Sequence, residues 1–145
     1  MTAKIQIVDG PVRRDGPPAF DGAGAVVEFL GIVRPVEGTE PIEALEYETY
    51  EPMAERELER IALGAIERHK LIGVQLWHSR GRVPAGQASL RVIVAAERRK
   101  AALAATDELI DELKRDVPIW KCPCKAVAAE AAEGDGHERA HNVGR

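Results

Sequence analysis

The sequence lacks the long apolar runs and the cysteine framework that mark membrane-embedded or secreted chains. No stretch approaches the roughly 20 apolar residues that span a bilayer, and the N-terminal segment holds no apolar run of signal-peptide length. Cys122 and Cys124 are the two cysteines among 145 residues, and their one-residue spacer would strain a mutual disulfide. This usage fits a reducing compartment, so we expect a cytoplasmic protein with no membrane contact.

An excess of positive charge is missing as well. The formal net charge is −4, whereas affinity for nucleic acid or anionic lipid needs a clustered positive field. We therefore expect no nucleic-acid partner. The basic residues that could form a local cluster fall at the ends of expected helices and strands: Arg34, Arg98, Arg99, Lys114, Lys121 and Lys125.

Length and composition predict one folded domain. An apolar fraction of 45% and a charged fraction of 30% are ordinary for a globular protein, and 145 residues can bury one core. We expect residues 1–145 to form this domain. Residues 126–145, which contain the helix-breaking GDG, are expected to be a divergent tail.

Periodicity predicts the order strands, helix, hairpin, helix. The expected strands cover residues 4–8, 25–33, 44–50, 73–83 and 88–96, and the expected helices cover residues 52–69 and 98–114. Between them, the turn-rich residues 11–20 are expected to hold no core. The predicted buried face of the second helix is Ala102, Leu103, Ala105, Thr106, Leu109, Ile110 and Leu113. This order favours an α+β fold with two main helices packed against a largely antiparallel sheet.

Two lysines seven residues apart carry the strongest chemical signal. In DELKRDVPIWK, Lys114 ends the second helix, Pro118 stops that helix, and Lys121 follows an extended turn. Both ammonium groups would enter one pocket if Ile119 and Trp120 fold back on the core, and amines there suit proton transfer or nucleophilic attack. The alternative is a pair of solvated charges, because lysine near a helix C-terminus is favoured by the dipole.

Arginines at the ends of elements are candidates for binding an anionic ligand. Arg34 follows the strand FLGIV, and Arg98 and Arg99 begin the second helix. Guanidinium groups bind phosphate oxygens in pairs, and a helix N-terminus also favours phosphate. The alternative is that these residues are surface charges.

A zinc site is a competing interpretation of the C-terminal region. Twelve residues separate Cys122-x-Cys124 from His137-x3-His141, which superficially resembles zinc-ligand spacing. However, a one-residue cysteine spacer is short for zinc, and the intervening KAVAAEAAEGDG lacks the bulky apolar residues that a small zinc module packs. We therefore expect no metal.

The remaining polar strand residues have structural interpretations. His78 is interpreted as a packed or half-exposed strand residue beside Trp77. Glu46 and Glu48 alternate with apolar positions and are interpreted as the wet face of a strand.

Four segments carry a resemblance to a known family. They are VVEFLGIVR, LEYETYEPMAERELERIA, HSRGRVPAGQASLRVIVAA and DELKRDVPIWK, in this order. Over about residues 24–121 the chain closely resembles the molybdopterin synthase catalytic subunit family. The run EYETYEPMAE together with the LK-x5-WK pair is distinctive.

The resemblance implies a fold, an activity and partners. The fold is α/β-hammerhead-like, and the protein is a homodimer that forms a heterotetramer with a small ubiquitin-like sulfur-carrier subunit ending in Gly-Gly. The activity is that of a sulfurtransferase without a cofactor. Two sulfurs pass from the carrier's C-terminal thiocarboxylate to cyclic pyranopterin monophosphate, which gives the dithiolene of molybdopterin.

The resemblance also implies roles for particular residues. Lys114 and Lys121 fall on the family's essential lysines; the first would activate the reacting carbon or acyl centre and the second would position pterin and carrier, although these roles could be exchanged. Arg99 matches an arginine that binds the anionic part of the substrate. The other residues matched to the substrate site are Ile32, Val33, Arg34, Arg98, Cys122 and Pro123. Because the family's sulfur comes from the carrier, Cys122 and Cys124 are predicted to take no part.

Two departures from the family pattern keep a second function class open. Family members commonly carry histidine where this chain has Arg98, and the tail lacks the expected aromatic-containing segment after its GDG. A non-catalytic paralogue that binds the carrier or scaffolds a dimer is therefore the alternative.

Overall fold

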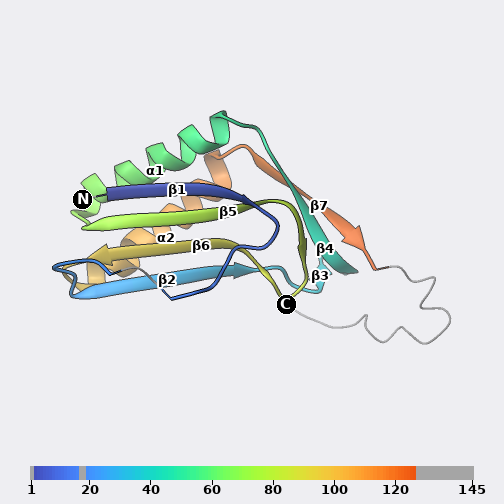
Figure 1. The fold of residues 1–145 in the computed structure, drawn as a ribbon, viewed down its shortest axis with the longest axis horizontal. Coiled ribbons are helices and arrows are strands. Elements are labelled where there is room, and N and C mark those ends of the chain that lie inside the picture. Colours follow the sequence, from blue (N-terminus) through green and yellow to red (C-terminus); the bar gives the residue numbers. More distant parts are fainter. Residues whose placement is uncertain (1, 17–18, 127–145) are drawn as a thin grey trace.

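The computed structural model describes residues 2–16 and 19–126, and in this part of the chain two helices cover one face of a seven-stranded sheet (Figure 1). The elements are β1 (Thr2–Asp9), β2 (Ala25–Ile32), β3 (Val36–Glu37), β4 (Glu40–Thr49), α1 (Met53–His69), β5 (Gly73–Pro84), β6 (Ala88–Ala96), α2 (Arg99–Asp116) and β7 (Ile119–Lys125). Both predicted helices and the predicted hairpin are present. No described helix is long and apolar enough to span a bilayer.

The sheet is antiparallel at every described pairing except one. The strand order is β2-β6-β5-β4-β3; β1 pairs with β5 in parallel, and β7 pairs with β4. These features confirm the predicted α+β class. The first strand of the chain, β1, lies at an edge of the sheet, since β5 is its one strand partner among the described residues.

β5 connects two parts of the sheet. Its first half, up to His78, pairs with β6, and its last residues, from Gly81, pair with β4. Gly81 has φ +90°, a backbone conformation that glycine adopts without a steric penalty. The strand therefore turns at this point, and β4 with β7 crosses the end of the larger sheet (Figure 1).

The core lies between the helices and the sheet because both helices bury one apolar face. α1 contributes Leu58 and Ile61, each at most 1% exposed, and α2 contributes Leu109, which is fully buried. Two expectations for α2 were wrong. Leu103 is 55% exposed and Ile110 is half-buried, because the buried face of the helix is a narrower stripe than expected, formed by Ala102, Ala105, Thr106, Leu109 and Leu113.

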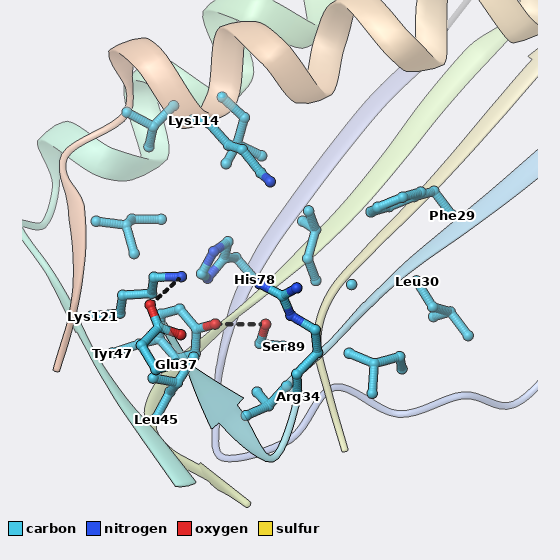
Figure 2. Close-up of a pocket in the computed structure, with 17 residues that line it drawn as sticks. Phe29, Leu30, Arg34, Glu37, Leu45, Tyr47, His78, Ser89, Lys114 and Lys121 are labelled. Carbon is cyan, nitrogen blue, oxygen red and sulfur yellow. Dashed lines mark hydrogen bonds and ion pairs between the residues drawn. The ribbon is translucent and has the colours of Figure 1, made fainter. Parts of the chain in front are cut away.

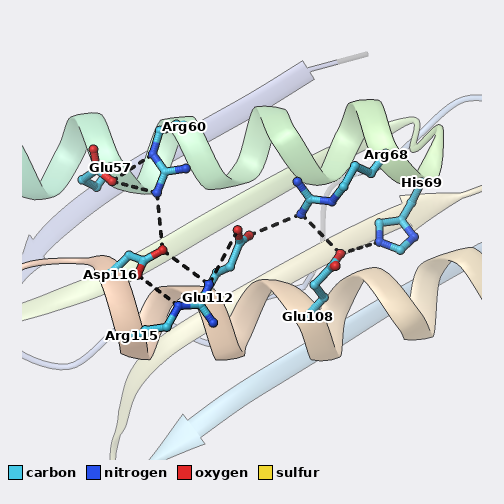
Figure 3. Close-up of polar contacts among 8 residues, drawn as sticks. All are labelled: Glu57, Arg60, Arg68, His69, Glu108, Glu112, Arg115 and Asp116. Atoms are coloured by element: carbon cyan, nitrogen blue, oxygen red, sulfur yellow. Dashed lines mark hydrogen bonds and ion pairs between the residues drawn. The ribbon is translucent and has the colours of Figure 1, made fainter.

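Ion pairs bridge the outer edges of the two helices (Figure 3). Arg68 lies 3.3 Å from both Glu108 and Glu112, and His69 lies 2.6 Å from Glu108. Exposed pairs of this kind contribute about 0–1 kcal/mol each. The packed apolar face, and not these pairs, therefore holds α1 against α2.

The segment before β2 crosses the second face of the sheet. The prediction that residues 11–20 hold no core was wrong, since Val12 is 4% exposed and its N–H donates to the Ala88 carbonyl. Arg91 of β6 is also buried and donates to the carbonyls of Arg13 and Asp15. We call this arrangement the Arg91 clamp. Turn-rich composition alone did not reveal it, because the contacts of Val12 and Arg91 that hold the segment come from the tertiary fold.

Candidate functional site

A pocket of about 680 Å³ opens where β5 passes from one part of the sheet to the other (Figure 2). Its walls come from β2, β3, β4, β5, β6, the end of α2 and β7. The apolar part of the lining includes Phe29, Leu45, Leu90, Leu113, Val117 and Ile119, and the polar part is Arg34, Glu37, Tyr47, His78, Ser89, Lys114 and Lys121.

The helix end and the following strand position the two lysines. Lys114 lies in the last turn of α2, directly after the buried Leu113, and its side chain points into the pocket (Figure 2). The helix ends before Pro118, and the chain then forms β7 instead of the extended turn that was expected. There Lys121 pairs with Tyr47 of β4 and lies 3.5 Å from the Glu37 carboxylate. Both lysines therefore line one cavity.

Residues after β2 form the wall opposite the lysines. The register shifts between Gly31 and Ile32, and Val33 then exchanges backbone hydrogen bonds of 2.9 and 2.8 Å with Gln87 and Gly86. These bonds fix the turn that directs the Arg34 guanidinium into the pocket (Figure 2). The predicted set Ile32, Val33 and Arg34 thus lies in the lining.

Three polar side chains at the base of the pocket had not been assigned to the site from the sequence. The Tyr47 hydroxyl and Ser89 Oγ are 2.9 Å apart, and His78 packs edge-on against the Tyr47 ring at 5.2 Å. Burial lowers the pKa of His78 more than its hydrogen bond to the Ser79 carbonyl raises it. Burial likewise raises the pKa of Tyr47, against the opposing effect of Ser89. The base of the pocket therefore carries a neutral histidine and a neutral tyrosine at pH 7.

Four of the predicted site residues do not line this pocket. Arg98 and Arg99 lie at the opposite end of α2, and 15 residues at 1.5 Å each separate Arg99 from Lys114 by about 22 Å. Cys122 pairs with Glu46 on the strand face opposite to that of Lys121, and Pro123 lies beyond the cavity. Within one chain, the lysines and the helix-start arginines cannot contact the same small ligand.

The described residues contain no cluster that could hold a metal ion. No group of three His, Cys, Asp or Glu side chains converges in residues 2–16 and 19–126. Cys122 is exposed and Cys124 is half-buried, both as free thiols. His137 and His141, the other members of the zinc alternative, lie outside the described residues.

The pocket gathers two lysines and an arginine on a two-layer α+β domain, an arrangement that suits an anionic ligand. The family model described as "MoaE protein" matches residues 11–116. The chain belongs to this family, and the predicted family relationship is confirmed.

Relatives and solved structures agree with this assignment. The chain is 36% identical to a molybdopterin synthase catalytic subunit of Pyrococcus abyssi over 79% of this chain and 77% of that protein. It is 42% identical to one of Mesorhizobium japonicum over 92% and 82%. The match to an Ajellomyces capsulatus relative spans 48% of that longer protein.

Two solved structures are similar to this chain. A molybdopterin synthase of Staphylococcus aureus superimposes with a TM-score of 0.73 at 30% identity, covering 83% of this chain and 90% of that one. A complex of subunits 1 and 2 of molybdopterin-converting factor from Helicobacter pylori has a TM-score of 0.66 at 22% identity, covering 96% and 94%. At this identity, the similarity to the Helicobacter pylori complex supports the fold alone.

Proposed function

We propose that this chain is the catalytic subunit of a molybdopterin synthase. It transfers sulfur from the C-terminal thiocarboxylate of a small ubiquitin-like carrier ending in Gly-Gly to cyclic pyranopterin monophosphate, and so forms the dithiolene of molybdopterin. Membership of a family whose curated relatives are such subunits supports this function. The observation that carries it is the convergence of Lys114, Lys121 and Arg34 on one cavity.

The chemistry of the pocket suits two anionic reactants. A thiocarboxylate and a phosphate both need cationic donors, and ammonium and guanidinium groups supply only donors. Lys114, which points into the cavity, stabilises charge and delivers protons at the reacting carbon or acyl centre. Lys121, held by Glu37 at the rim, positions the carrier terminus and the pterin.

The complete site takes residues from two copies of the chain. Because about 22 Å of α2 separates Arg99 from Lys114, Arg98 and Arg99 reach the substrate anion only from a second subunit of a homodimer. The dimer binds one carrier per subunit and forms a heterotetramer. We infer that residues 1–145 form one domain with residues 126–145 as its tail, and that the protein lies in the cytoplasm, where its two thiols stay reduced.

A reconstituted assay tests the activity. Purified chain, thiocarboxylated carrier and cyclic pyranopterin monophosphate are combined, and molybdopterin formation is compared among wild type, Lys114→Ala and Lys121→Ala. Each variant is expected to lose on the order of 100-fold or more in rate. The matched control is Lys125→Ala, on the same strand as Lys121 but paired with Glu40 outside the pocket, and it keeps the wild-type rate.

The same assay separates the two function classes. If the wild type binds carrier yet makes no molybdopterin, the chain is a non-catalytic carrier-binding paralogue, and the departure at Arg98 becomes the first explanation to examine. If Lys125→Ala loses as much activity as Lys121→Ala, the pocket is not the reaction site.

Subunit complementation tests the shared site. In a mixed dimer of Lys114→Ala with Arg99→Ala, one of the two sites combines both defects and the other has both native residues. Activity should therefore return when two inactive variants are co-expressed. If mixing recovers nothing, Arg99 does not act across the dimer.

A further inference from the structure

His78 has one ring nitrogen engaged and one free. The side chain is 5% exposed, and Nδ1 lies 2.8 Å from the Ser79 carbonyl oxygen. A carbonyl can only accept, so Nδ1 carries the hydrogen and Nε2 carries a lone pair. The backbone of the residue's own strand thus fixes the tautomer.

The free nitrogen faces the pocket and not the core. Nε2 has no hydrogen-bond partner among residues 2–16 and 19–126, and Ser79 Oγ is the one buried side-chain polar atom of this part of the chain without a partner. Nε2 is therefore reached by solvent, and the solvent-filled space that His78 lines is the pocket. Figure 2 places the imidazole between Lys114 and Lys121.

Among the other polar groups that line the pocket around His78, Glu37 alone carries a basic atom when the lysines are charged, and its carboxylate is engaged in an ion pair. Lys114 of α2, Lys121 of β7 and Arg34 after β2 present only donors when charged. The Glu37 carboxylate faces Lys121 at 3.5 Å. The Tyr47 hydroxyl is hydrogen-bonded to Ser89, and burial raises its pKa, so it stays protonated.

If the chain has the proposed function, on which this inference rests, one step of sulfur transfer needs a proton acceptor. When the thiocarboxylate sulfur forms its bond to a substrate carbon, the carrier's acyl carbon is still attached to that sulfur. Releasing the carrier requires water to attack the acyl carbon: a carbon–oxygen bond forms, the acyl carbon–sulfur bond breaks with its electron pair on sulfur, and the water must lose a proton.

We propose that His78 Nε2 is the general base that takes the proton from this water, so that it is a catalytic residue for the release of the desulfurised carrier. The sulfur stays on the substrate as a thiolate, and the carrier leaves as a carboxylic acid that ionises to the carboxylate by losing the second proton of the water to solvent. The first proton, taken up by His78, passes from the imidazolium to bulk water. The lowered pKa of His78 supports this role, because burial keeps the imidazole neutral at pH 7 and so able to accept a proton.

A glutamine variant distinguishes proton uptake from simple hydrogen bonding. His78→Gln places an acceptor oxygen near the position of Nε2 but cannot take up a proton. With thiocarboxylated carrier and cyclic pyranopterin monophosphate in single turnover, we expect carrier release to slow by about 100-fold or more. A covalent carrier–substrate adduct should accumulate and be visible by intact mass spectrometry, whereas its formation keeps the wild-type rate.

The pH profile supplies a second readout. In the wild type, carrier release falls on the acid side as His78 becomes protonated, with an apparent pKa below 6.5, and this acid limb is absent in His78→Gln. His69→Gln is the matched control, because His69 lies on the helix surface beside Glu108, and it leaves both readouts unchanged.

Other results with His78→Gln would refute either the general-base role of His78 or the proposed function. If His78→Gln releases the carrier at the wild-type rate, a hydrogen-bond acceptor alone suffices. If His78→Gln no longer forms the adduct, His78 acts at an earlier step. Either result refutes the general-base role. If His78→Gln does not fold, as judged by circular dichroism, His78→Ala with added imidazole replaces it, and failure of imidazole to restore release refutes the role. A wild type that yields neither adduct nor molybdopterin refutes the proposed function itself.

Discussion

Replacing Arg91 by alanine should destabilise the protein through the Arg91 clamp. The side chain is 4% exposed, and its Nε donates to Glu28 at 2.6 Å while Nη1 donates to the Arg13 carbonyl at 3.3 Å. The guanidinium also lies 4.9 Å from the centre of the Trp77 ring. One residue thus connects β6 with β2, β5 and the segment that crosses the sheet.

The magnitude follows from what the substitution leaves behind. Removing one partner of a fully buried ion pair costs about 3–5 kcal/mol. Here the Glu28 side chain is 34% exposed and is partly rehydrated when Arg91 is lost, so the low end applies. Loss of the stacking on Trp77 adds about 1 kcal/mol or less. We therefore expect the free energy of unfolding to fall by about 3 kcal/mol and Tm by roughly 10 °C.

Urea denaturation at fixed protein concentration measures this change. Arg91→Met keeps most of the buried stem and should recover part of the loss, which separates packing from charge. Arg82→Ala is the control, since Arg82 is 51% exposed and 3.7 Å from Glu43, and it should cost less than about 1 kcal/mol. If Arg91→Ala unfolds within about 1 kcal/mol of wild type, the segment is held by other contacts and the reasoning fails.

Two further predictions follow from ion pairs. Glu37→Gln removes the carboxylate that competes with the carrier terminus for Lys121, in an ion pair that is half-exposed. Affinity for the anionic carrier terminus, measured by titration calorimetry, should therefore rise about 2- to 5-fold, the equivalent of about 0.5–1 kcal/mol. Unchanged or weaker binding would contradict this. Hydrogen bonds from Thr49 and then from Arg80 lower the pKa of Glu51 below 4.5, so its stabilising effect is fully present above pH 4.5 and is lost as the pH falls through the folded-state pKa. Glu51→Gln should therefore be less stable than wild type at pH 7 and approach it in acid, and thermal unfolding that shows the same difference at both pH values would refute the linkage.

The elements with a strong period could be predicted from the sequence. In α1 many apolar residues follow the helical spacing, and in the hairpin many follow the strand alternation, so the pattern of each segment indicates whether it is a helix or a strand. β7 could not be predicted, because KCPCK shows no apolar alternation and Pro123 lacks a backbone donor. That strand exists through its pairing with β4, which only the tertiary fold supplies. The two-residue β3 is likewise too short to leave a pattern.

The candidate site was predictable where residues fall at the ends of elements. Lys114 lies in the last turn of α2, Lys121 lies near the start of β7 and Arg34 follows β2, and these ends converge on one pocket. His78 was interpreted as a packed or half-exposed strand residue and is buried, but alternation along β5 does not tell which buried position borders a cavity. Arg99 was assigned to the same site as the lysines from the sequence, but within one chain the length of α2 separates it from them.

The pairing of β4 with β7 determines when the pocket can exist during synthesis. Thr49 pairs with Ile119 and Ile42 pairs with Lys125, so each contact joins residues that leave the ribosome far apart in time. Both helices and the hairpin are already translated when Ile119 emerges. A nascent chain therefore offers the carrier a finished site only after its last described strand, which bears Lys121, has docked on β4.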